Sequence, residues 1–372
     1  MRHIFAHSRQ TATLKRNSDR IPSKPRSGKV DWISVEATCL LGFCLLVFVV
    51  MLIGMGEPSA AGRRSTDPDI GVREIVSLSA GQPEVAIRYI DRCLIWNHQT
   101  DQARSIWLPA SEHHITALAG SSVAPEIFIG RADGWLTLID LPSQVPLWKN
   151  VDIGDGPTHS IFSPDGATIA VTTNAGRLIL LDAKTGALRW EFNCGDSPLM
   201  TACFSNTGDR IFTVSTGSKL IAVDTRSGQL DEVLSDDVTR PSSFSVSDDG
   251  RYLAIGTFGG RVILRDLIAD KECYNAEHSS TAILAVHHDP RSEELIYSAT
   301  SGIVGAIALD EGHQRTWIGK HSEAVPSIVI QDDALITGSF DGEIRTRSRS
   351  PAGRFTNGTT FASSQTLAPQ AL

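Results

Sequence analysis

Two pairs of adjacent histidines come nearest to the residue types that bind a metal ion. They are His113-His114 and His287-His288, and Asp289 directly follows the second pair. Imidazole nitrogens and carboxylate oxygens are common zinc ligands. Each pair lies in an expected strand, however, where neighbouring side chains point to opposite faces. We therefore interpret these histidines as turn or surface residues and assign no metal site.

Five regularly spaced aspartates are the next candidates, because carboxylates can act as acids or bases. Each one ends an apolar run, and the gaps between them are 42, 42, 42 and 44 residues. The five are Asp140, Asp182, Asp224, Asp266 and Asp310. An aspartate can also accept backbone N–H groups two or three residues further on, in a turn that a glycine closes, as in DAKTG. Only a turn role explains why the residue recurs in every copy, so we assign these aspartates to turns.

The remaining sequence offers no catalytic motif and no sign of nucleic-acid binding. It contains no GxSxG, HExxH, Walker or Rossmann sequence. The chain carries a net charge of −8, to which residues 1–62 contribute +4, and this leaves −12 for the rest. Affinity for nucleic acid depends on neutralising phosphates, which an acidic domain does poorly. The sequence therefore predicts a protein that is not an enzyme, binds no nucleic acid and carries no cofactor.

Four cysteines outside the apolar N-terminal segment are the possible disulfide partners. Cys93, Cys194, Cys203 and Cys273 fall on different expected strands and show no CxxC spacing. An oxidising compartment would permit disulfides, but free cysteine is among the most buried residue types. We expect buried thiols.

The aspartates belong to a repeat of about 42 residues. A second marker keeps the same spacing: SPDG begins at Ser163, SNTG at Ser205 and SDDG at Ser247. Asp-Gly and its relatives supply the positive φ of tight hairpin turns, and the flanking runs alternate as strands do. A period near 40 with short strands and glycine turns is typical of a β-propeller with one four-stranded sheet per repeat.

Counting the copies gives an all-β fold, a seven-bladed β-propeller over residues 72–360. The expected blades are 72–111, 112–156, 157–197, 198–239, 240–280, 281–323 and 324–360. The clearest copy is expected to form strands at 158–162, 168–174, 177–182 and 187–193. The last copy is weak after its third strand. Either residues 355–360 or the residues just before Val72 complete it.

The repeat resembles the WD40 family. ALITGSFDGEIR at 334–345 is similar to that family's second and third strands, and His278 and His321 fall near its Gly-His position. Only Trp96 occupies the tryptophan of the family's Trp-Asp pair, so the buried His–Ser/Thr–Asp–Trp network of the family is incomplete in every blade. The resemblance implies a propeller that binds other proteins.

A second resemblance is to quinoprotein-like propellers. Aromatic residues recur on the expected outer strands, as in DAKTGALRW at 182–190. They are Trp107, Trp148, Trp190, Tyr274 and Trp317. In that family an outer-strand tryptophan docks between neighbouring blades, and a quinone can be bound. We favour the WD40 resemblance, because the SPDG turns and the seven copies fit it better.

An apolar segment at 37–56 predicts a membrane anchor. Its 20 uncharged residues match a helix that crosses a bilayer core of about 30 Å. Eight basic residues precede it, and basic residues stay on the cytoplasmic side. We therefore predict a single-pass membrane protein with a disordered basic cytoplasmic tail at 1–36, a linker at 57–71, an extracytoplasmic propeller (periplasmic in a bacterium) and a disordered tail at 361–372. A cleaved signal peptide ending near Ser59-Ala60-Ala61 is the alternative.

Turns that join the second and third strands of the blades are the candidate binding surface. Loops on one face of a propeller commonly carry its function, and bulky apolar residues in exposed turns can anchor a partner. The candidates are Arg131, Asp133, Asn174, Phe258, Phe340 and Asp341. The sequence thus predicts a non-enzymatic scaffold for an unknown protein partner. The alternative is a quinoprotein-like enzyme or sensor that binds a small ligand.

Overall fold

The computed structural model describes residues 71–78, 82–90, 92–106, 114–195, 197–217, 219–235, 240–247, 249–289, 291–310, 312–351 and 353–355. The chain divides into two units, 1–51 and 52–372, and every described residue belongs to the second. The expected tail at 1–36, the anchor at 37–56 and the tail at 361–372 lie outside the described residues. Within the ranges above, no helix is long and apolar enough to cross a membrane.

Seven antiparallel sheets follow one another along the chain, and each is one blade. The strands of blades one to four are β1 (Glu74–Ser77), β2 (Glu84–Arg88), β3 (Cys93–Asn97), β4 (Gln102–Ser105); β5 (Ile115–Gly120), β6 (Glu126–Arg131), β7 (Trp135–Asp140), β8 (Val145–Asp152); β9 (Pro157–Phe162), β10 (Thr168–Thr173), β11 (Arg177–Asp182), β12 (Leu188–Asn193); β13 (Leu199–Phe204), β14 (Arg210–Ser215), β15 (Leu220–Asp224) and β16 (Leu230–Ser235). Those of blades five to seven are β17 (Pro241–Val246), β18 (Tyr252–Thr257), β19 (Arg261–Asp266), β20 (Lys271–Glu277); β21 (Ile283–Asp289), β22 (Glu294–Ala299), β23 (Ile303–Ala308), β24 (Arg315–Lys320); β25 (Ser327–Gln331), β26 (Ala334–Gly338) and β27 (Ile344–Ser348). The predicted seven-bladed propeller is confirmed.

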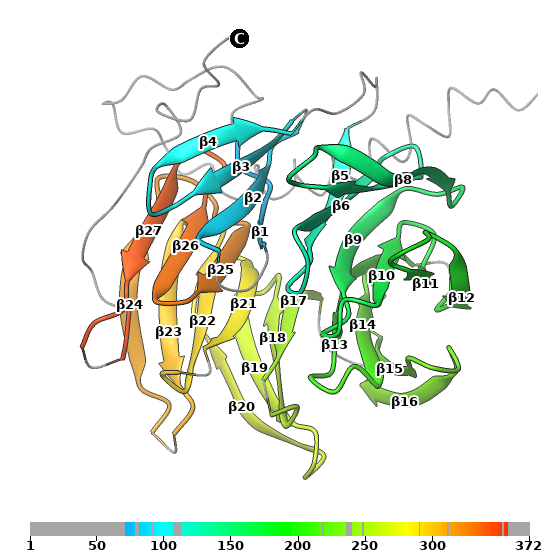
Figure 1. Ribbon diagram of the computed structural model, residues 1–372. Helices are drawn as coiled ribbons and strands as arrows, with labels where there is room; N and C mark the ends of the chain where they lie inside the picture. The colour runs from blue at the N-terminus through cyan, green and yellow to red at the C-terminus, as the bar shows by residue number, and fades with distance from the viewer. Residues whose placement is uncertain are drawn as a thin grey trace, which may run out of the picture. The chain divides into compact units, whose positions relative to one another are not determined.

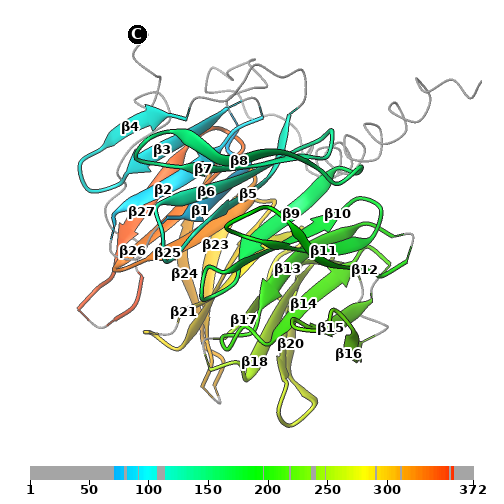
Figure 2. The same ribbon diagram turned by 45° about the vertical axis from the view of Figure 1, so that its right-hand side comes forward.

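The blades form a closed ring. The first strand of every blade contacts the first strand of the next, and β25 of the last blade contacts β1. Figures 1 and 2 show the last blade, in orange, beside the first, in blue. Middle strands are mostly buried, as in β10, whereas outer strands such as β12 are largely exposed. Because burial decreases from the middle strands to the outer strand, the middle strands appear in the sequence as apolar runs.

Side chains from the last blade complete the ring. The Ser327 hydroxyl accepts the Ile75 N–H at 2.9 Å and donates to the Ile75 carbonyl at 3.2 Å. The Gln331 amide donates to the carbonyl of Glu84 at 3.2 Å. These partners are about 250 residues apart in sequence. The contact between the first and last blades therefore depends on hydrogen bonds as well as on apolar packing.

The outer edge of the last blade begins to pair with the C-terminal segment. Phe355 forms an isolated antiparallel bridge with Arg349, and its side chain is 1 % exposed. The Arg349 guanidinium lies 4.3 Å from the Phe355 ring centroid and binds Asp289 of blade six. Residues 356–360 and those before Gly71, the two segments proposed to complete this blade, lie outside the described residues.

Candidate functional site

Each recurring aspartate accepts hydrogen bonds within its own turn. Asp182 accepts the Thr185 N–H at 3.0 Å, and Asp224 accepts the Ser227 N–H at 2.7 Å. The other three do the same with residues two or three positions on: Ser143 with Asp140, Ile268 and Ala269 with Asp266, and Gly312 with Asp310. Hydrogen bonds from Arg189 and Thr185 lower the pKa of Asp182, and the Ser227 hydroxyl lowers that of Asp224. Carboxylates with a lowered pKa stay ionised, and their oxygens are occupied by hydrogen bonds within the turn. This suits a structural role in the turn and not proton transfer.

Two of the outer-strand tryptophans, Trp148 and Trp190, dock onto the neighbouring blade, whereas Trp317 on β24 is 50 % exposed and Trp107 lies outside the described residues. The Trp148 indole N–H donates to the Ala183 carbonyl of blade three at 2.7 Å, and Trp190 donates to Thr225 of blade four at 2.8 Å. A Cβ on Gly228 would lie 2.6 Å from the Trp190 ring, so this turn accepts the ring because it carries glycine. The glycine of the DAKTG-type turn therefore closes its own turn and receives the tryptophan of the preceding blade.

The two phenylalanines of the candidate surface occupy equivalent turns between the second and third strands, on what we call the 2–3 face. The Phe258 N–H donates to the Arg240 carbonyl at 2.9 Å, and the Phe340 N–H donates to the Ala324 carbonyl at 2.9 Å. Both side chains are half-buried. The Arg240 guanidinium lies 5.7 Å from the Phe258 ring centroid, and that of Arg73 lies 4.8 Å from Phe340. Each phenylalanine ring thus makes a cation–π contact with an arginine side chain, while part of the ring stays exposed to solvent.

The other predicted surface residues occupy the same face on different blades. Arg131 and Asp133 form an ion pair in blade two, and Asn174 is exposed in blade three. Asp341 follows Phe340 in blade seven and accepts the Glu343 N–H at 2.8 Å. Arg131 therefore lies beside Asp133, and Phe340 beside Asp341. The six predicted surface residues as a whole are spread over blades two, three, five and seven.

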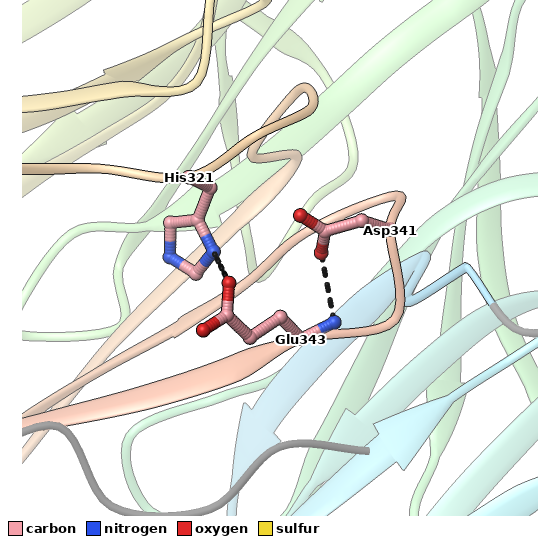
Figure 3. A group of neighbouring side chains, drawn as sticks. All are labelled: His321, Asp341 and Glu343. Carbon is pink, nitrogen blue, oxygen red and sulfur yellow. Dashed lines mark hydrogen bonds and ion pairs between the residues drawn. The ribbon is translucent and has the colours of Figure 1, made fainter. Parts of the chain in front are cut away.

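Three side chains of different kinds converge beside Phe340 (Figure 3). His321 follows β24, while Asp341 and Glu343 lie in and just after the turn between β26 and β27. One ligand atom of each lies within 4.8 Å of the others, and His321 Nδ1 is 3.7 Å from Glu343 Oε2. Burial, together with the charge of Arg345, lowers the pKa of His321 to about 4. The sequence patterns point to His321 and Asp341 but not to Glu343. Glu343 lies one residue before β27, and no motif or spacing in the sequence indicates it.

His287 and His288 point to opposite faces of β21 as the strand argument requires, but the interpretation of His288 as a turn or surface residue is wrong, because it lies buried within the strand. His288 is 4 % exposed and His287 is half-buried, and they are consecutive in β21. His114 is exposed, and His113 lies outside the described residues. The four cysteines are free thiols. Cys93 is buried as expected, and burial raises its pKa to about 12, but the expectation is wrong for Cys273, which is exposed because β20 is an outer strand.

A cavity of about 290 Å³ opens on the opposite face, among the turns between first and second strands. Its apolar lining includes Ile161, Phe162 and Phe204, and its polar lining includes Ser163, Asn206 and Ser247. None of the residues that line it carries a charge.

Comparison with known proteins finds a partial relative and a family model that covers more than half of the chain. The chain is 24% identical over 174 residues to the meiotic recombination protein rec14 of Schizosaccharomyces pombe, which covers 46% of this chain and 57% of that protein. The chain therefore spans little more than half the length of this curated relative. The family model described as outer membrane protein assembly factor BamB matches residues 132–351, more than half of the chain. With Trp148 and Trp190 seated on the glycine turns of the next blade, this seven-bladed propeller belongs to the family of outer membrane protein assembly factor BamB.

Proposed function

We propose that this propeller is a non-enzymatic docking scaffold that binds another protein through its 2–3 face. The observation that carries the proposal is the pair of half-exposed phenylalanines, Phe258 and Phe340, at equivalent positions of that face. Aromatic residues and arginines dominate the binding energy of protein interfaces. Here each phenylalanine lies beside an arginine, Arg240 or Arg73.

The turns that carry these anchors are held in place before binding. Gly260 and Gly342 adopt φ values of +77° and +83° and donate their N–H groups to Thr257 and Ser339 at 3.1 and 3.0 Å. Only glycine adopts this conformation without strain. A partner that binds a fixed turn loses less conformational entropy on association, which favours affinity.

The proposed location follows from the apolar segment and from the family. Residues 37–56 would hold the chain in a membrane with its N-terminus in the cytoplasm and the propeller outside. The matched family is named for the assembly of outer membrane proteins. A partner in the cell envelope is consistent with both.

The quinoprotein alternative has weaker support. An anionic quinone cofactor needs cations, and the residues that line the 290 Å³ cavity are uncharged. The tryptophans of the second resemblance, Trp148 and Trp190, are bound to the neighbouring blades by their indole N–H groups. The lining does not fit such a cofactor.

Cross-linking in cells tests the docking proposal. Tagged full-length chain and a tagged 1–62 control are cross-linked, and the proteins that co-purify only with the full chain are identified. We expect the double variant Phe258→Ala/Phe340→Ala to reduce recovery of such a partner at least about tenfold, since interface hot spots contribute about 2 kcal/mol or more. The matched control is Ile268→Ala, which removes a 79 % exposed side chain from the turn after β19, away from the 2–3 face. Equal recovery with the double variant, or loss with Ile268→Ala alone, would show that the 2–3 face is not the docking surface.

A further inference from the structure

Among the described residues, no strand pairs with the outer edge of β27, so blade seven has three strands there and each other blade has four. The Arg349 N–H donates to the Asp333 carbonyl at 2.8 Å, which shows that the odd-numbered residues of this segment face β26. Backbone groups of an antiparallel strand alternate between its two edges. Ile344, Thr346 and Ser348 therefore direct their N–H and carbonyl groups to the outer edge of the blade.

β27 is buried to the degree of an inner strand. Thr346 and Arg347 are each 5 % exposed. The third strand of a complete blade, such as β11, is buried in the same way, whereas the outer strands β4 and β12 are exposed over most of their length. Buried backbone N–H and carbonyl groups are almost always hydrogen-bonded. β27 thus has the surroundings of a third strand, whose outer backbone groups require a fourth strand as partner.

The turn after β27 reverses the chain beside this outer edge. The Ser350 N–H donates to the Arg354 carbonyl at 2.8 Å, and Arg349 pairs with Phe355 in an antiparallel bridge. Gly353 adopts φ +82° and donates its N–H to the Ser350 carbonyl at 2.8 Å. At residue 355 the chain has therefore already begun to run antiparallel to β27.

Contacts with blade six hold this turn in place. Phe355 is 1 % exposed and belongs to the same apolar cluster as Ile318 of β24. The Arg349 guanidinium donates to Asp289 Oδ1 at 2.9 Å, and both side chains of this ion pair are buried. Removing either partner of a buried ion pair is costly, so such a pair fixes the position of its residues. Blade six therefore sets the direction in which the chain leaves Phe355.

The N-terminal segment, the other candidate for the fourth strand, contacts a different part of blade seven. The Val72 N–H donates to the Ser339 carbonyl at 3.0 Å, and a Cβ on Gly71 would lie 2.9 Å from the Phe340 carbonyl oxygen. Within the part of the chain that the structure describes, these contacts join the N-terminal segment to the turn between β26 and β27. They do not involve the outer edge of β27.

We propose that residues 356–360 occupy the outer edge of β27 as the fourth strand of blade seven. The chain continues over 356–372 after Phe355, and five of these residues match the five of β27. A strand antiparallel to β27 ends beside the turn between β26 and β27, so residues 361–372 leave the blade at the 2–3 face. The outer edge of β27 is then closed to a strand from another protein.

The bridge between Arg349 and Phe355 fixes the register of this pairing. Continued by one residue, it places Thr356 opposite Ser348. Because Ser348 directs its backbone groups outward, Thr356 exchanges hydrogen bonds with it. The N–H of the next residue, Asn357, points away from β27.

Amide hydrogen exchange of the full chain, followed by mass spectrometry, tests the pairing without any partner protein. We expect slow exchange over 344–348, and Thr356→Pro should accelerate it at least about tenfold, because proline removes a hydrogen bond of the ladder. Asn357→Pro is the matched control, since it removes an N–H that points away from β27 and should leave the exchange close to that of the parent chain. Exchange in β10 of blade three is the internal reference for global folding and should be equal in all three proteins.

Three results would overturn the proposal. Fast exchange at Ile344, Thr346 and Ser348 in the parent chain would show that the edge is open. Slow exchange that Thr356→Pro leaves unchanged would show that another segment covers it. Equal acceleration by Asn357→Pro and Thr356→Pro would contradict the register.

Discussion

Gly228 and Trp190 illustrate how a residue in one blade constrains a residue in another. Gly228 adopts φ +67° and closes its own turn, while a Cβ there would meet the ring of Trp190 at 2.6 Å. Two independent requirements thus select the same glycine. The indole also hydrogen-bonds to Thr225, so the contact has both an apolar and a polar part.

Gly228→Ala should destabilise the chain more than a comparable glycine change elsewhere. Positive φ costs an L-residue about 1–2 kcal/mol, and the clash with Trp190 adds to this. Gly250 has φ +70°, and no atom lies within 4 Å of the place that a Cβ would take, so Gly250→Ala isolates the backbone cost. Urea unfolding of both variants provides the comparison. In a double-mutant cycle, Trp190→Ala should cancel the excess cost of Gly228→Ala, and strictly additive costs would contradict a steric origin.

Among the strands, the contact between β25 and β1 that closes the ring is made by hydrogen bonds as well as by apolar packing. The Ser327 hydroxyl bonds both backbone groups of Ile75, and the Ser327 side chain is buried. Similar bonds recur between other blades, since Thr158 donates to Leu199 and Ser242 donates to Ile283. Short hydroxyl side chains on inner strands therefore satisfy backbone groups across the boundaries between blades.

Ser327→Ala should lower the free energy of unfolding by about 1–3 kcal/mol, because it leaves buried backbone groups of Ile75 without a partner. Amide hydrogen exchange at Ile75 should accelerate in the same variant. Ser160→Ala is the matched control: Ser160 is 3 % exposed and its hydroxyl has no partner, so its removal should be neutral or stabilising. Equal losses for both serines would show that the closing bonds contribute no net stability.

Three histidines of the propeller favour the neutral form: His288 is buried, and His159 and His278 are half-buried. Burial lowers the pKa of His159, His278 and His288 to about 4, from 6.5. Both ring nitrogens of His288 are buried without a partner. Phe204 and Val246 stand two repeats and one repeat earlier at the equivalent position, so an apolar side chain fits there. Between pH 6.5 and about 4 the unfolded chain binds more protons than the folded one.

His288→Val should therefore flatten the pH dependence of stability. The folded pKa is depressed, so the free energy of unfolding falls as pH decreases from 6.5 towards about 4, by about 2 kcal/mol for one such histidine at about pH 5. The variant removes that contribution and should be more stable than the parent, most clearly at about pH 5. Urea midpoints measured at about pH 7.5 and pH 5 test this. His114→Val changes an exposed histidine as the control, and an unaltered slope in His288→Val would contradict the prediction.

Local patterns in the chain were enough to specify the repeat, the number of blades and the turns. These patterns are apolar runs, glycine turns and an aspartate every 42 residues. The strands expected at 158–162, 168–174, 177–182 and 187–193 differ from β9 to β12 by at most one residue at either end. Hydrogen bonds between residues two or three positions apart need no tertiary information, which is why the turn roles of Asp182 and Asp224 could be predicted.

Packing between the blades determines which residues meet across them. The glycine that receives Trp190, the bond between Ser327 and Ile75, and the approach of Glu343 to His321 all join different strands or blades. Such pairs depend on how neighbouring sheets twist and pack, and a one-dimensional period of 42 carries no information about that packing.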